Sequence, residues 1–114
     1  MAVNRAHIID QAFIESIKNV QSPSFEASLD NCIDAKSSLL GWQAIEILES
    51  MMESRQMDIY ARELKKMGEG FYTIGSSGHE CNAAVAAAAR LDDMAFLHYR
   101  SGPFYIQRAK QHGH

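Results

Sequence analysis

The longest periodic segment of the chain runs from Trp42 to Met67 and predicts one long helix. Acidic side chains lie early in this segment and basic ones late, which suits the helix dipole. Gly68 and Gly70 follow directly, as expected of a carboxyl-terminal helix stop. Apolar residues recur at helical spacing on one face, which broadens toward the carboxyl end; they are Ile45, Leu48, Met52, Ile59, Tyr60, Leu64 and Met67.

A second apolar stripe, near the amino terminus, predicts a helix from about residue 4 to residue 20. Asn4 is a suitable cap for this helix, and Pro23 lies just beyond its end. Because such stripes are usually buried, we expect this helix to pack in the core. The stripe comprises Ile8, Ile9, Phe13, Ile14, Ile17 and Val20.

The region between the two predicted helices contains breakers and gives a weak signal. Leu29, Ile33 and Ala35 are compatible with a short helix there. We interpret residues 21–40 as a connection that joins an amino-terminal helical arm (1–40) to the main body (41–114).

The part of the chain after Gly70 predicts shorter elements. Phe71–Ile74 is β-prone, and a turn follows it. Ser77 and Glu80 form an S-x-x-E capping box, which predicts a helix that starts near Gly78 and continues through the alanine-rich residues 83–89. The thin side of that helix allows another backbone to approach closely.

Two further elements complete the predicted fold. Residues 94–98 predict a short buried strand, and Gly102-Pro103 opens a last helix that runs toward Gln111. The predicted fold class is therefore predominantly helical, with one or two short strands. Because a strand needs partner strands beside it, we expect this chain to be truncated or to be completed by a partner.

Composition excludes several classes of protein. The hydrophobic fraction of 46% is typical of a globular chain, and a net charge of −3 argues against non-specific binding to nucleic acid. No apolar run has the length of a membrane span, and the amino terminus lacks the apolar core of a signal peptide. Cys32 and Cys81 form no C-x-x-C pair. We expect a cytoplasmic protein, and the mitochondrial matrix is also compatible.

Short blocks in a characteristic order run through the region from Ala44 to Gln107, a little over half of the chain. Together they resemble the α subunit of the thiamin-diphosphate-dependent 2-oxo acid dehydrogenases, the decarboxylating first component of those complexes. The segment Ser101–Phe104 favours the branched-chain (2-oxoisovalerate) type. The blocks are Arg55 and Asp58 on the long helix, Gly70-Phe71, Gly78-His79-Glu80 before the alanine run, Asp92-Asp93, and Tyr99-Arg100.

The resemblance implies an α/β thiamin-diphosphate-binding fold and a role in oxidative decarboxylation of a 2-oxo acid, followed by acyl transfer to lipoyl. It implies that Tyr99 and Arg100 bind the cofactor diphosphate, with His98 close to the cofactor. A guanidinium fork and a phenol suit phosphate oxygens. The implied partners are the β subunit or β region, the lipoyl-bearing acyltransferase and the 2-oxo acid substrate, in an oligomer.

Two departures from the family pattern limit what the chain is expected to do by itself. His79 stands where the family usually has glutamine or glutamate. The G-D-G…N magnesium motif and the cofactor-activating glutamate are both missing, so we expect magnesium ligands and catalytic residues outside this chain. The isolated chain is expected to be inactive.

Simpler interpretations of the same residues remain open. Tyr99 and Arg100 are also compatible with a half-buried tyrosine and a surface arginine at a strand end, and His98 with a packed residue. Arg55 and Asp58 are expected to pair structurally. Two other functions are a non-catalytic helical protein-interaction module, whose long helix docks a partner, and a regulatory fragment that keeps the family's fold without activity.

Overall fold

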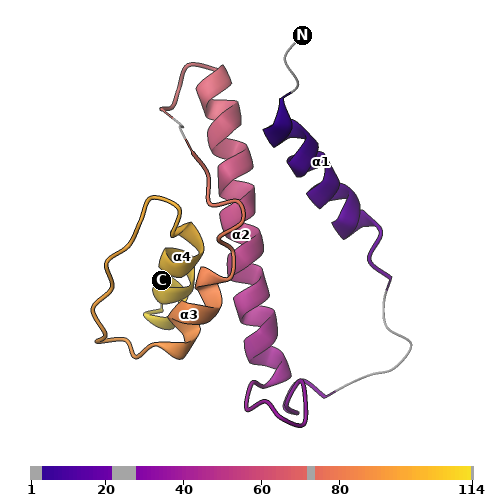
Figure 1. Cartoon of the computed structure of the whole chain (residues 1–114), viewed down its shortest axis with the longest axis vertical. Helices are drawn as coiled ribbons and strands as arrows, with labels where there is room; N and C mark the ends of the chain where they lie inside the picture. The colour runs from indigo at the N-terminus through magenta and orange to yellow at the C-terminus, as the bar shows by residue number, and fades with distance from the viewer. Residues whose placement is uncertain (1–3, 22–27, 72–73, 114) are drawn as a thin grey trace.

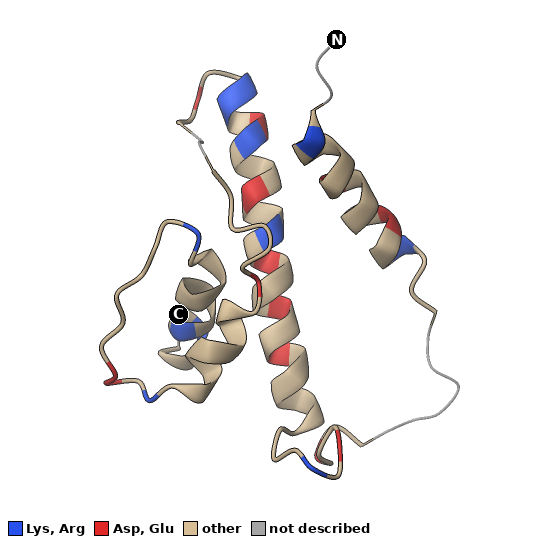
Figure 2. Ribbon diagram, in the orientation of Figure 1, with Lys and Arg blue, Asp and Glu red and all other residues tan. Residues whose placement is uncertain are grey.

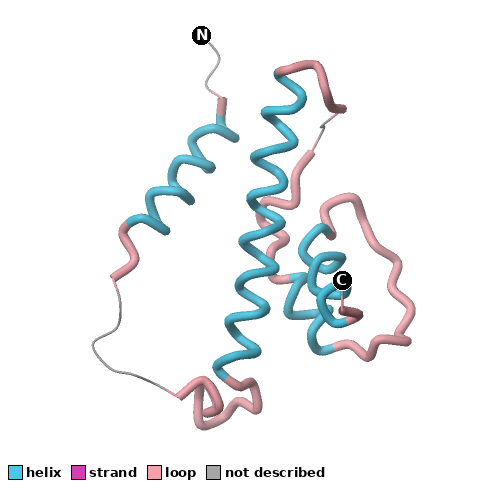
Figure 3. Tube along the Cα trace, turned by 180° about the vertical axis from the view of Figure 1, so that it is seen from behind, coloured by secondary structure: helices cyan, strands magenta, loops and turns pink. Residues whose placement is uncertain are grey.

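The computed structural model describes residues 4–21, 28–71 and 74–113, and this part of the chain is mostly helical. Its helices are α1 (Arg5–Lys18), α2 (Gly41–Lys66), α3 (Asn82–Ala88) and α4 (Gly102–Gln111). α2 is the central element: α3 and α4 pack together against one side of it, and α1 lies along the other side (Figures 1 and 3).

The predicted long helix is confirmed, including its end. Its acidic residues predominate in the first half and its basic residues in the last turns (Figure 2). The Gly68 N–H donates to the Lys65 carbonyl at 3.1 Å, and the Glu69 N–H donates to the Leu64 carbonyl at 2.9 Å. Gly68 has φ +79°, the left-handed conformation that this pair of hydrogen bonds requires. Glycine therefore ends α2 by satisfying its last carbonyl groups.

α3 and α4 pack closely against each other and against α2. Ala83 and Ala86 of α3 are completely buried. At the start of α4, a Cβ added to Gly102 would lie only 2.8 Å from Ser54 Oγ of α2. The close approach expected of the alanine-rich helix is thus used for packing within the chain.

Much of the buried surface around α2 is polar. The Ser50 hydroxyl donates to Gln107 Oε1 at 2.8 Å, and Gln107 Nε2 donates to Glu46 Oε1 at 2.8 Å. The hydroxyls of Ser54 and Ser76 lie 2.7 Å apart. Hydrogen bonds therefore fix α4 and the loop before α3 on α2.

α1 forms close to the predicted bounds, but it is not the core-packing helix that we expected. Asn4 caps it as predicted, accepting from the His7 N–H at 3.4 Å. The apolar stripe is largely uncovered, with Ile8 55% and Val20 74% exposed. The reason is that α1 meets α2 mainly through charged side chains, while the buried hydrophobic residues, Ala83, Ala86 and Phe104, lie on α3 and α4.

The strand predicted at residues 94–98 is wrong. These residues have no regular secondary structure, and Phe96 is 98% exposed. A strand is stabilised by a ladder to a neighbour, and the described part of the chain contains no strand to supply one. The β-prone segment Phe71–Ile74 includes residues 72 and 73, which lie outside the described residues, so that prediction stays open.

Two local predictions also need correction. α3 begins at Asn82 instead of near Gly78, because Gly78 has φ +85° and turns lead from Ser76 into the helix. In the connection before α2, turns and an isolated bridge between Cys32 and Leu40 replace the short helix. Among the described helices, none is long and apolar enough to cross a lipid bilayer.

Candidate functional site

A cavity of about 310 Å³ lies where four separate segments meet, and three arginines line it. Arg55 and Arg62 come from α2, and Arg100 comes from the turn that leads into α4. The remaining lining residues are Ala6 and Ile9 of α1, and Ile74, Gly75 and Ser77 of the loop before α3.

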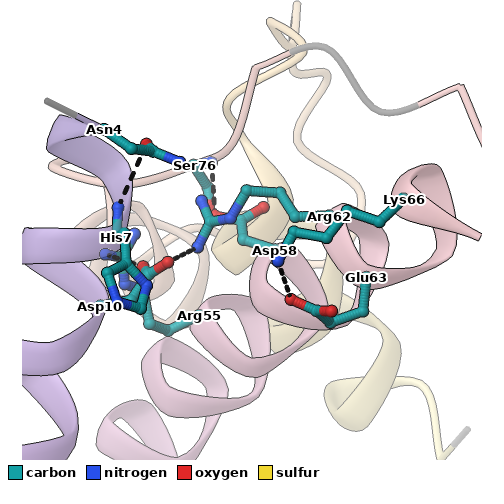
Figure 4. A network of polar contacts seen from close by, with 9 residues as sticks. All are labelled: Asn4, His7, Asp10, Arg55, Asp58, Arg62, Glu63, Lys66 and Ser76. Atoms are coloured by element: carbon teal, nitrogen blue, oxygen red, sulfur yellow. Dashed lines mark hydrogen bonds and ion pairs between the residues drawn. The ribbon is translucent and has the colours of Figure 1, made fainter. Parts of the chain in front are cut away.

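The two arginines of α2 are bound by one carboxylate of α1. Arg55 Nη2 donates to Asp10 Oδ1 at 2.9 Å, and Arg62 Nη2 donates to Asp10 Oδ2 (Figure 4). Arg55 and Asp10 are both buried, and the Arg55 guanidinium also lies 5.8 Å from the centre of the Phe13 ring. Because Arg55 and Arg62 are about two helical turns apart, they lie on the same face of α2.

Arg55 has donor capacity that this ion pair does not use. Its side chain is only 4% exposed, and Nη1 is buried without a hydrogen-bond partner among the described residues. A buried donor without an acceptor costs about 1–3 kcal/mol. An acceptor that comes within reach of Nη1 would satisfy that donor.

Asp58 holds the loop that forms the opposite wall. It accepts from the Ser76 N–H at 2.7 Å and from the Ser76 hydroxyl at 2.8 Å. This anchor places Gly75 and Ser77, the neighbours of Ser76, at the cavity. The expected pairing of Arg55 with Asp58 is therefore wrong: Arg55 pairs with Asp10 of α1, and Asp58 accepts from Ser76 of the loop before α3.

The three residues that the sequence assigns to cofactor binding lie together in the turn before α4. The His98 and Tyr99 rings have centroids 3.7 Å apart, and the Arg100 guanidinium lies 5.7 Å from the centre of the Tyr99 ring. Arg100 is the member of this group that lines the cavity, whereas Tyr99 is 61% exposed and His98 is also exposed. In the described part of the chain, Arg100 forms no ion pair.

Sequence reasoning missed Asp10, Arg62 and Ser77. The sequence pattern could have identified Asp10, because at helical spacing it shares a face with Phe13 and Ile17. A carboxylate on such an apolar stripe needs a partner when it is buried. Arg62 carried a weaker signal, since it follows Arg55 at two-turn spacing. Ser77 was missed because the S-x-x-E pattern assigned it to the start of a helix instead of to a binding site.

A larger cavity of about 750 Å³ lies between α2, α3 and α4. Trp42 and Leu91 contribute apolar surface there, while Glu46, Gln107 and Lys110 contribute polar groups. None of the predicted site residues lines it. The arginine-lined cavity is therefore the stronger candidate for binding a charged ligand.

The chemistry of the smaller cavity fits an oxyanion such as a diphosphate. Guanidinium groups donate paired hydrogen bonds to phosphate oxygens, and the Ser77 hydroxyl is a further donor. Among the described residues, no group of three or more acidic, histidine or cysteine side chains is arranged to hold a metal ion. Comparisons of the chain with protein-family models, curated proteins and solved structures find no match.

Proposed function

We propose that this chain is the amino-terminal part of the decarboxylating first component of a 2-oxo acid dehydrogenase complex, of the branched-chain type. In this proposal the chain contributes contacts to the diphosphate of thiamin diphosphate. Two independent features support it: the order and spacing of the sequence blocks that end in Tyr99-Arg100, and the arginines around one cavity.

The observation that carries the proposal is the position of Arg100 beside Arg55 and Arg62 at the 310 Å³ cavity. Like charges repel, and gathering them in a partly buried place costs free energy unless an anion compensates. Asp10 compensates the two arginines of α2, while Arg100 has no carboxylate partner in the described part of the chain. A ligand with several anionic oxygens matches this excess of donors.

The residues of this chain have binding and orienting roles in the proposed reaction. Arg100 provides a guanidinium, which lies 5.7 Å from the centre of the Tyr99 ring, and Ser77 provides a hydroxyl. When bound, thiamin diphosphate supplies an electron sink for decarboxylation of the 2-oxo acid. We place the magnesium ligands and the cofactor-activating glutamate outside this chain, with the β subunit or β region and the lipoyl-bearing acyltransferase as partners.

The test is a titration of the 114-residue chain with inorganic pyrophosphate, thiamin diphosphate and thiamin monophosphate, followed by amide NMR shifts. We expect Arg100→Ala to weaken pyrophosphate and thiamin diphosphate binding by at least about tenfold, since a charge-assisted hydrogen bond contributes about 1.5–3 kcal/mol. Thiamin monophosphate is expected to bind more weakly than either.

The matched control is Arg90→Ala, because Arg90 is an exposed arginine that pairs with Asp93 away from the cavity. It should leave the titration unchanged. Equal affinities for the wild type and Arg100→Ala would remove Arg100 from the site and with it the structural support for the proposal.

A second candidate function is the non-catalytic helical protein-interaction module. The specific observation in its favour is the larger cavity, which opens beside exposed apolar side chains such as Trp42 and Leu91. The titration separates the two functions: an interaction module requires no pyrophosphate binding and no effect of Arg100→Ala.

A further inference from the structure

α1 is attached to the rest of the molecule by charge more than by apolar burial. Asp10 is the buried residue of this helix, and its carboxylate contacts both arginines of α2. Ile8 and Ile9, which precede it, are more than half exposed. A helix held in this way depends on a small number of contacts and can be released by a competitor for them.

The contacts that hold α1 are the same donors that a phosphate ligand would use. Asp10 accepts from Nη2 of Arg55 and from Nη2 of Arg62, and both arginines line the anion cavity. Ala6 and Ile9 of α1 also form part of the wall of that cavity. The docked helix therefore offsets one of the three positive charges at the site and narrows the cavity.

We propose that α1 is an internal competitor of the anion: the Asp10 carboxylate occupies Arg55 and Arg62, and a diphosphate that binds there releases the helix. This inference rests on the proposed anion site and describes its regulation. Release does not require α2 to unwind, because residues 19–40 separate the two helices along the chain. α1 leaves while α2, α3 and α4 keep their packing.

The same contact sets the selectivity of the site. A monovalent anion that displaces the Asp10 carboxylate only substitutes one negative charge for another, so it gains little binding free energy. A diphosphate brings several charges and can bind Arg55, Arg62 and Arg100 together, so it outcompetes the carboxylate. We therefore expect pyrophosphate, and not acetate at the same ionic strength, to release α1.

The first test compares pyrophosphate affinity in the wild-type chain and in Asp10→Asn. If α1 is docked nine-tenths of the time, the apparent affinity of the wild type is about tenfold below that of the open site. Asp10→Asn is thus expected to tighten binding by about tenfold. Glu15→Gln is the matched control, because it removes the same charge from an exposed position of the same helix and should change nothing.

A second variant separates release of the helix from simple loss of charge. Phe13 keeps α1 against Arg55 through its ring, so Phe13→Ala weakens docking without altering any charge. We expect it to tighten pyrophosphate binding as well, by a smaller factor than Asp10→Asn. If Asp10→Asn tightened pyrophosphate binding and Phe13→Ala did not, Asp10 would act only through its charge. That result would overturn competition by the helix.

The third measurement uses the wild type, so it does not depend on how the variants fold. Saturating pyrophosphate is expected to accelerate amide hydrogen exchange in residues 5–18 and to leave residues 82–88 and 102–111 protected. Sodium chloride and acetate at matched ionic strength are the controls. Unchanged or slower exchange in α1 would show that the helix stays docked when the anion binds.

The outcomes distinguish this inference from the function on which it rests. If pyrophosphate binds and depends on Arg100, but is equally tight in the wild type and Asp10→Asn, the site stands and the competition fails. If pyrophosphate binds neither the wild type nor Asp10→Asn, both fail. Weaker binding by Asp10→Asn would also overturn the inference, since Asp10 would then be organising the arginines for the ligand.

Discussion

Individual buried polar side chains join the helices of this protein through hydrogen bonds and ion pairs. Gln107 is almost completely buried and exchanges hydrogen bonds with two residues of α2: it accepts from Ser50 and donates to Glu46. Asp10 has the corresponding role for α1. Both are buried amide or carboxylate groups whose partners lie far away in the sequence, so the loss of either leaves unsatisfied groups behind.

Gln107→Ala is therefore expected to destabilise the chain by about 2–3 kcal/mol, because it removes the hydrogen bonds to the buried Ser50 and the half-buried Glu46 and opens a cavity. The measurement is the free energy of unfolding from urea denaturation followed by circular dichroism. Gln56→Ala is the control, since Gln56 is an exposed position on α2. An equal unfolding midpoint for both variants would contradict a stabilising role for the Gln107 network.

Each helix owes its stability to a different source. α2 is long and is ended by a glycine motif, so much of its structure is local. α3 spans 7 residues, which is too short for a stable isolated helix, and it depends on packing against α4 and α2. α1 has a cap and a regular apolar pattern but little burial, so it forms locally and docks through Asp10.

Ala86→Leu is the sharpest test of the packing of α3. Ala86 is fully buried, and the larger side chain has no room there without displacing α3 or α4. We expect a loss of about 1–3 kcal/mol in the free energy of unfolding, as is typical of overpacking. Val85→Leu, on the exposed side of the same helix, should cost much less. Equal thermal unfolding midpoints for Ala86→Leu and Val85→Leu would show that α3 is loosely packed.

The molecule as a whole is expanded for its mass. Its Cα radius of gyration is 16.4 Å, compared with about 13 Å for a compact domain of this length. Its accessible surface is 8821 Å², compared with about 6,200 Å² for a compact monomer of 12.7 kDa. Obligate interfaces bury about 2,000–5,000 Å² summed over both partners, so an excess of about 2,600 Å² on one chain corresponds to the upper end of that range.

We therefore expect the chain to associate, with its own copies or with the remainder of an enzyme. Size-exclusion chromatography with light scattering over a concentration series measures this directly for the isolated chain. The expected result is a mass that rises above the 12.7 kDa of one chain as the concentration increases. A constant monomer mass at every concentration, with a radius of gyration near that of a compact domain, would contradict the expectation.

The sequence by itself determined the elements that depend on neighbouring residues. Three helix ends were specified by single residues: the start of α1 by Asn4, the end of α2 by Gly68 and the start of α4 by Pro103. The structure confirms all three. These signals are reliable because capping and termination involve residues within a few positions of each other. The assignment of Arg100 to diphosphate binding rests on the family resemblance and stays a prediction.

Only the tertiary structure decided which distant residues meet. Asp10 and Arg55 are 45 positions apart in the chain, and no local pattern pairs them. The cavity needs Arg100, from the turn before α4, beside Arg55 and Arg62 of α2, and this convergence follows from how α4 and the loop before α3 pack on α2. Residues 94–98 failed to form a strand for the same reason: a β-prone segment becomes a strand only when another strand lies beside it.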